Sequence, residues 1–124
     1  MQRTDAPKKV LVVEDDLDCV EAIAEALEGD GYVVAKAHNG AEALLYFENQ
    51  DPPNLVLLDL MMPHMDGWEF VGEYRKKKGR LAPIVILSGE QRLIRIASEL
   101  GVAGYLRKPV DVDTLLATVA RLAS

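Results

Sequence analysis

Short runs of apolar, often β-branched residues alternate along this chain with longer stretches of helical periodicity. The short runs are continuous rather than polar at every second position, which is typical of strands buried on both faces. Parallel strands need helical crossovers, and right-handed crossovers place helices on both sides of a sheet. The pattern therefore predicts an α/β fold, a three-layer doubly wound (βα)5 domain with a five-stranded parallel sheet. The predicted strands span 10–13, 32–36, 55–58, 84–87 and 104–107, and the predicted helices span 17–28, 41–48, 68–77, 91–100 and 112–122.

Composition limits the classes of protein that this chain can belong to. Its 124 residues, 49% of them hydrophobic, suit one domain with a sizeable core, and we expect an extended or disordered tail over 1–7 and a domain over 8–123. The net charge of −6 argues against direct nucleic-acid binding, which calls for a basic surface. The first residues lack the apolar core of a signal peptide, and no run of roughly 18 apolar residues occurs. We expect a cytoplasmic protein without membrane contact.

Several residues have plain structural interpretations. Asp16 precedes the first helical stretch, where aspartate is a favoured N-cap. The lone Cys19 excludes an intrachain disulfide and is interpreted as a small packing residue. His38 and His64 are interpreted as solvated loop residues, and Trp68 as a partly buried helix residue. The predicted inner helix faces carry Val20, Ile23, Ala24 and Leu27, then Phe70, Val71 and Tyr74, then Leu115, Val119 and Leu122.

Polar residues stand where the strand-like runs end. In a parallel α/β sheet the carboxyl ends of the strands form the edge at which ligands bind, so one shared site is expected there. The residues concerned are Glu14, Asp15 and Asp16 after the first run, Asp59 after the third, Ser88 after the fourth, Tyr105 within the fifth, and Lys108 before Pro109.

Three carboxylates in one cleft need compensation. Two charges about 4 Å apart repel by roughly 4 kcal/mol at an effective dielectric constant of 20, so either a proton or a hard divalent cation such as Mg²⁺ is expected among Glu14, Asp15 and Asp59. Asp59, at a central strand end, is the candidate nucleophile toward phosphorus, with Lys108 as its cationic partner and Ser88 as a hydrogen-bond donor to a phosphoryl oxygen. The expected product is an acyl phosphate.

Taken together and in order, four strings resemble the receiver domain of two-component response regulators, over about residues 8 to 123. They are Val-Val-Glu14-Asp15-Asp16, Leu-Leu-Asp59-Leu-Met-Met-Pro63-His-Met-Asp66-Gly67, Leu-Ser88-Gly and Tyr105-Leu-Arg-Lys108-Pro109. Each string alone is weak, but their joint order is specific. The resemblance implies a flavodoxin-like fold and a signalling protein that is not an enzyme beyond its own phosphorylation and dephosphorylation.

The resemblance also implies roles for individual residues. Asp59 matches the phosphoacceptor, which takes a phosphoryl group from a phosphohistidine on a sensor histidine kinase or histidine phosphotransfer protein. Asp15 and Asp59 match direct ligands of Mg²⁺, for which Mn²⁺ is an acceptable substitute. Glu14 matches an acid that reaches the metal through water, and Met61 a ligand through its backbone carbonyl.

In the same family pattern, Ser88 and Tyr105 match the switch pair, in which the hydroxyl moves toward the phosphoryl group and the ring turns inward. Lys108 matches the cation that binds the phosphoryl group, and the family typically has a cis bond before the proline at Pro109. Output is expected through a downstream partner that binds the fourth helix, fifth strand and fifth helix, since only a short segment follows Pro109.

The sequence departs from the family pattern at one interval. Lys108 lies 20 residues after Ser88, slightly fewer than the pattern leads us to expect, so the loop after Ser88 or the fourth helix should be short. This affects the usual partner surface and the role of Glu90. No lifetime of the phosphorylated state is predicted from Met61.

Two other classes of function stay open. One is a receiver fold that serves as an interaction scaffold without phosphorylation. The other is a phosphohydrolase of the haloacid dehalogenase type, which also uses an aspartate nucleophile and Mg²⁺ but carries a second aspartate where Met61 stands. Tyr105 also has a plain reading as an edge-strand aromatic, and Asp66-Gly67 as a turn into the third helix.

Overall fold

Strands and helices alternate without interruption along the chain. The computed structural model describes residues 7–62, 65–77, 79 and 81–123, which leaves His64, the tail up to residue 6 and the family-motif proline Pro63 outside the described residues. The elements are β1 (Lys9–Val13), α1 (Leu17–Gly29), β2 (Val33–Ala37), α2 (Gly40–Asn49), β3 (Leu55–Asp59), α3 (Gly67–Tyr74), β4 (Ile84–Ser88), α4 (Leu93–Leu100), β5 (Gly104–Arg107) and α5 (Val112–Leu122).

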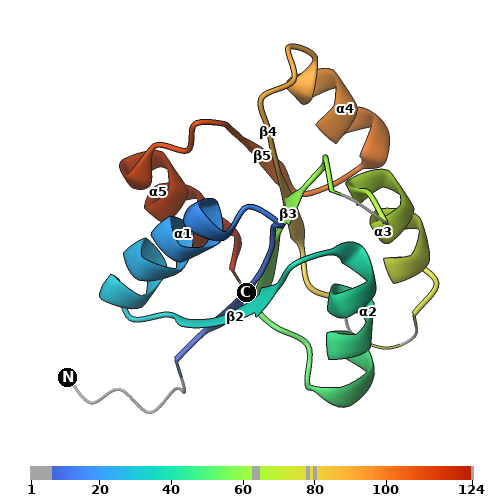
Figure 1. Ribbon diagram of the computed structural model, residues 1–124, viewed down its shortest axis with the longest axis horizontal. Coiled ribbons are helices and arrows are strands. Elements are labelled where there is room, and N and C mark those ends of the chain that lie inside the picture. The colour runs from blue at the N-terminus through green and yellow to red at the C-terminus, as the bar shows by residue number, and fades with distance from the viewer. Residues whose placement is uncertain (1–6, 63–64, 78, 80, 124) are drawn as a thin grey trace.

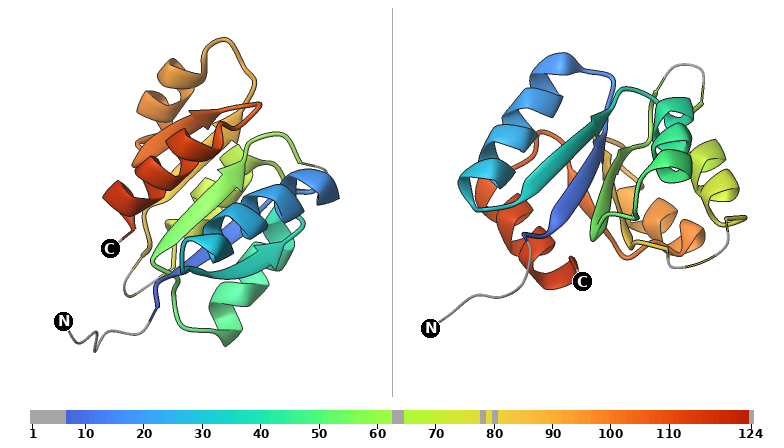
Figure 2. Two further views of the ribbon diagram at one scale, coloured as in Figure 1. Left: turned by 90° about the vertical axis from the view of Figure 1, so that its left-hand side faces the viewer. Right: turned by 90° about the horizontal axis from the view of Figure 1, so that it is seen from below.

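The five strands form one parallel sheet in the order β2-β1-β3-β4-β5. Helices α1 and α5 cover one face, and α2, α3 and α4 cover the other (Figures 1 and 2). The chain leaves β1 toward β2 on one side and returns to β3 on the other, so the strand order reverses between β1 and β3. The predicted doubly wound, three-layer fold is confirmed, and such a reversal is the usual place for a ligand in this fold.

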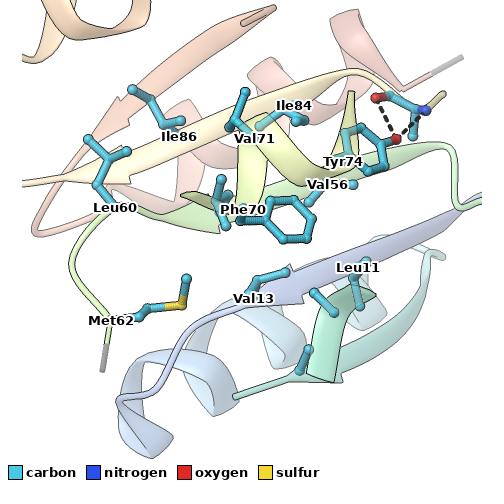
Figure 3. Close-up of a cluster of buried hydrophobic side chains, with 14 of the residues drawn as sticks. Leu11, Val13, Val56, Leu60, Met62, Phe70, Val71, Tyr74, Ile84 and Ile86 are labelled. Atoms are coloured by element: carbon cyan, nitrogen blue, oxygen red, sulfur yellow. Dashed lines mark hydrogen bonds between the residues drawn. The ribbon is translucent and has the colours of Figure 1, made fainter. Parts of the chain in front are cut away.

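Successive side chains of the central strands enter two separate cores, because neighbouring residues of a strand point to opposite faces. Leu11, Val56 and Ile86 face α2, α3 and α4, where Phe70 and Tyr74 are buried among them (Figure 3). Val12 and Leu57 face α1 and α5. Burial on both faces explains why these strands read as continuous apolar runs.

The helices begin where the sequence supplies caps. The Asp16 carboxylate accepts a hydrogen bond from the N–H of Cys19, which confirms the predicted N-cap of α1. Asp66 and Glu69 form a reciprocal capping box at the start of α3. A Cβ at Gly67 would lie 2.8 Å from Leu60 Cα, so only glycine fits where the loop after Asp59 closes onto α3. This loop geometry anchors the end of β3.

Several predicted boundaries are wrong by one to three residues, and α1, α2, β3 and β4 each extend one residue beyond the predicted range at one or both ends. β2 begins and ends one residue later than 32–36. α3 ends at Tyr74 rather than at 77, although Lys76 and Lys77 continue in tight turns through N–H bonds to the carbonyls of Glu73 and Tyr74. α4 begins at Leu93 rather than at 91. The predicted inner faces of α1 and α3 are buried, and on α5 Leu115 and Val119 are buried while Leu122 is half-buried.

Candidate functional site

Three carboxylates meet at the point where the strand order reverses. Glu14 and Asp15 follow β1, and Asp59 is the last residue of β3 beside it. One oxygen of each carboxylate lies within 4.8 Å of the others, as the sequence analysis predicts. Glu14 is fully buried and Asp59 is 4% exposed, whereas Asp15 faces solvent. The cluster is therefore a pocket with two buried acids and one acid at its rim.

Lys108 enters the same pocket from the segment after β5. Its Nζ lies 2.6 Å from Glu14 Oε1 and 3.3 Å from Asp59 Oδ1. The contact with Glu14 is an ion pair that is not aligned as a hydrogen bond, since Glu14 Oε1 has no hydrogen-bond partner of good geometry among the described residues. The peptide bond from Lys108 to Pro109 is cis, as the family resemblance implies. The lysine thus bridges the two buried acids.

Burial and charge set the protonation of this pocket. Burial, followed by the hydrogen bond and the charge of Glu14, raises the pKa of Asp59 to about 7. Burial would also raise the pKa of Glu14, but the interactions with Lys108 and Asp59 outweigh it and lower that pKa. Burial opposes the charge of Lys108, yet the two acids outweigh it and raise the lysine pKa. The pocket therefore carries more negative charge than Lys108 alone compensates.

The pocket's donor set fits a hard divalent cation. Its oxygens come from carboxylates, with one acid at the solvent rim, which suits an ion that keeps part of its water shell. The N–H of Met61 lies 3.4 Å from Asp59 Oδ1, so the backbone after β3 turns back over this carboxylate. The Met61 side chain is 62% exposed.

Ser88 ends β4 next to Asp59 and is 2% exposed. Its Oγ accepts a hydrogen bond of 3.0 Å from the N–H of Glu90. Tyr105 lies on β5 and is 41% exposed. The short interval from Ser88 to Lys108 holds an eight-residue α4 and a four-residue β5.

Arg107 is the residue of this region that sequence reasoning misses. It pairs with Ser88 across β4 and β5, and its Nη1 donates a 2.8 Å hydrogen bond to the Glu90 carbonyl. An arginine between Leu106 and Lys108 carries no signal for this contact in the sequence, because the contact depends on the register of two strands.

Two other residues keep their structural interpretations. Cys19 packs against the core between α1 and α5, and burial, followed by Glu14, raises the pKa of its thiol to about 12, so it is not a reactive nucleophile. His38 is exposed, and its Nδ1 lies 3.2 Å from Glu42 Oε1.

The fold and the pocket define a class of α/β proteins in which buried acids and one lysine meet at the carboxyl edge of a parallel sheet. The family model for the response regulator receiver domain matches residues 10–120. Response regulator MprA of Mycobacterium ulcerans (strain Agy99) is 35% identical over 115 residues, which cover 92% of this chain and 49% of MprA. The chain spans about half the length of the curated relatives it matches.

Solved structures agree with this match. A putative response regulator from Chloroflexus aurantiacus superposes with a TM-score of 0.85 at 29% identity, covering 95% of this chain and 98% of that chain. Chemotaxis protein CheY4 of Vibrio cholerae superposes with a TM-score of 0.83 at 31% identity, covering 94% of this chain and 99% of that chain. The chain belongs to the response regulator receiver domain family.

Family membership gives the function at a coarse level: this is a receiver domain of two-component signalling, a class that works with histidine kinases and downstream effectors. The scaffold and phosphohydrolase alternatives are not favoured. Within the described residues, no helix has the length and apolar character needed to cross a membrane.

Proposed function

We propose that Asp59 is the phosphoacceptor of this receiver domain, which we take to span residues 8–123. The observation that carries the proposal is the position of the Asp59 carboxylate, nearly buried, 3.3 Å from Lys108 and clustered with Glu14 and Asp15. The donor is a phosphohistidine on a sensor histidine kinase or a histidine phosphotransfer protein. We expect the domain to work in the cytoplasm, where a thiol such as that of Cys19 stays reduced.

The reaction is an in-line displacement at phosphorus. One Asp59 oxygen attacks, a P–O bond forms, and the P–N bond to the donor imidazole breaks. The electron pair of that bond leaves with the imidazole nitrogen, which takes up a proton. Lys108 Nζ, already within ion-pair distance of Asp59, balances negative charge on the phosphoryl oxygens. The domain catalyses this transfer onto itself and the later hydrolysis, and no other reaction.

Asp15, Asp59 and the Met61 carbonyl would hold Mg²⁺ directly, and Glu14 would reach it through water. Bound there, Mg²⁺ would supply the charge that keeps Asp59 ionised and that offsets charge on the phosphoryl group. Mn²⁺, with similar oxygen preference, would substitute. Glu14 keeps Lys108 in the pocket through their 2.6 Å contact, which orients the ammonium before the donor arrives.

Ser88 and Tyr105 are the proposed switch. A phosphoryl group brings roughly −1.5 to −2 charges into the pocket, and the Ser88 hydroxyl turns toward it. Tyr105, exposed on β5, then moves inward and alters the surface of α4, β5 and α5, through which a downstream effector reads the state. The phosphoryl group thus biases an equilibrium between two conformations.

Incubation with acetyl phosphate and intact-mass measurement test the proposal. We expect one phosphoryl adduct in the presence of Mg²⁺, none in EDTA and none on the Asp59→Asn variant. Asp51→Asn, a change at an exposed acid away from the pocket, should leave the adduct unchanged. An adduct that survives Asp59→Asn or EDTA would overturn the assignment, and complete lack of an adduct would favour the scaffold alternative.

A further inference from the structure

Two hydrogen bonds hold Glu90 in the turn between β4 and α4, one at its backbone N–H and one at its backbone carbonyl. The Glu90 N–H donates to Ser88 Oγ at 3.0 Å, and the Glu90 carbonyl accepts from Arg107 Nη1 at 2.8 Å. No side chain caps the start of α4, where Arg92 occupies the N-cap position. Among the described residues, the Ser88 hydroxyl and the Arg107 guanidinium are therefore the side chains that tie this turn to the sheet.

The Arg107 contact lies where the switch has to move. Ser88 and Arg107 are directly paired in the β4–β5 register, and Lys108 donates its N–H to the Ser88 carbonyl. Leu106 points into the core beside α1 and α5, so Tyr105 and Arg107 both point to the opposite face, the one that α4 covers. The same face thus carries the switch tyrosine and the arginine that holds the turn.

We propose that Arg107 is a positioning residue that holds the domain in its resting conformation through its hydrogen bond to the Glu90 carbonyl, a contact that we call the clasp. This inference rests on the proposed phosphoryl switch. While the clasp is closed, the turn presents the Glu90 N–H to Ser88 Oγ and keeps the hydroxyl in the turn. When Ser88 moves toward a phosphoryl group on Asp59, this hydrogen bond breaks, the turn shifts and the Arg107 contact opens. Arg107 therefore shifts the equilibrium between the resting and the active conformation of the unphosphorylated domain toward the resting one.

Charge and conformation predict opposite effects of removing Arg107. Loss of a cation next to Lys108 weakens the binding of an anion to the pocket, whereas loss of the clasp makes the active conformation easier to reach. A hydrogen bond from an exposed charged group is worth a few-fold in a conformational equilibrium, so Arg107→Ala should bind a phosphoryl mimic about three- to tenfold more tightly. A purely electrostatic role gives weaker binding.

The test is titration of the Mg²⁺-loaded protein with beryllofluoride, followed by the backbone amide spectrum in NMR. Arg107→Ala should raise the affinity, and the Glu90 amide of the free variant should shift toward its position in the saturated wild type. Arg107→Lys keeps the charge but lacks the planar guanidinium, so its affinity for beryllofluoride should lie between those of wild type and Arg107→Ala. Arg95→Ala, which removes an exposed arginine paired with Glu99 on α4, should match wild type.

Each outcome decides the inference. Tighter binding together with the Glu90 shift supports the clasp, while unchanged or weaker binding, or an unshifted Glu90 amide, overturns it. If wild type itself binds no beryllofluoride, the proposed function fails as well. If wild type binds and Arg107→Ala binds no better, only the clasp fails.

Discussion

Replacing Asp59 with asparagine should make the metal-free protein more stable. Asp59 is 4% exposed and shares its pocket with Glu14 and Asp15. Asparagine keeps the shape of the side chain and removes one negative charge. The gain should be absent once Mg²⁺ saturates the wild type.

The size of the effect follows from the distances in the pocket. At an effective dielectric constant of 20, two carboxylates within 4.8 Å each repel Asp59 by about 3.5 kcal/mol or more, and Lys108 at 3.3 Å attracts it by about 5 kcal/mol. The repulsions together exceed the attraction by about 2 kcal/mol, and burial of the charge acts in the same direction. A pKa raised to about 7 from an ordinary value near 3.8 sets an upper limit of roughly 4 kcal/mol. We expect a gain of about 2 kcal/mol, close to the net Coulomb repulsion and below the limit, because the buried asparagine amide must also be desolvated.

The pH dependence has a defined direction. Asp59 in the folded protein keeps its proton up to about pH 7, whereas the unfolded chain loses it at the ordinary aspartate value. Between these values the folded state binds more protons, so the stability of wild type falls as the pH rises. The advantage of Asp59→Asn is therefore absent near pH 4, grows through this window and is constant above about pH 7.

Urea unfolding of both proteins in EDTA at pH 4, 6 and 8, repeated with Mg²⁺ at pH 8, measures this difference. Asp51→Asn, which changes an exposed loop acid, controls for loss of net charge. A variant that is less stable than wild type at pH 8 in EDTA, or a gain that does not depend on pH, would show that Asp59 is not a destabilised charge.

Three shorter predictions concern the same pocket and the loop that supports it. Mg²⁺ at about 100 times its dissociation constant should stabilise wild type by about 2.7 kcal/mol in thermal unfolding, and Asp15→Asn should lose most of this gain; an undiminished gain would place the metal elsewhere. Lys108→Met leaves two buried acids without their cation and should lower the stability in urea unfolding by about 3 kcal/mol at pH 8. The loss should be smaller at low pH, where the acids bind protons, and a variant as stable as wild type at pH 8 would refute the ion pairs. Gly67→Ala forces a Cβ to within 2.8 Å of Leu60 Cα and should lower the stability by about 2 kcal/mol. In the same helix, a Cβ at Gly72 meets no atom within 4 Å, so Gly72→Ala should stabilise by about 0.5 kcal/mol. Equal effects of the two changes would contradict the close approach at Gly67.

The positions of the acids could be predicted because they depend on one rule of parallel sheets. Glu14, Asp15 and Asp59 follow strands whose two faces are both buried, and such strands have recognisable continuous apolar sequences. Their carboxyl ends must then meet at one edge. Lys108 could be assigned to the same edge because it follows the fifth strand, and the family resemblance added its role as the cation that binds the phosphoryl group.

What the sequence could not supply depends on contacts between elements. The burial of Glu14 and its 2.6 Å contact with Lys108 depend on how the segment after β5 packs against the end of β1. The sequence of β1 alone does not indicate either of them. The clasp of Arg107 on Glu90 requires the β4–β5 register. The late start of α4 at Leu93 has a similar cause, because residues 89 to 92 form the turn that Ser88 and Arg107 hold, although Gln91 and Arg92 are good helix formers.

The most direct test of the central claim is a crystal structure of the protein with Mg²⁺ and beryllofluoride. The account predicts a beryllium–oxygen contact on Asp59, Lys108 and Ser88 on the fluorides, and the metal held by Asp15, Asp59 and the Met61 carbonyl. Beryllofluoride bound away from Asp59, or Lys108 still paired only with Glu14 in the occupied pocket, would contradict it.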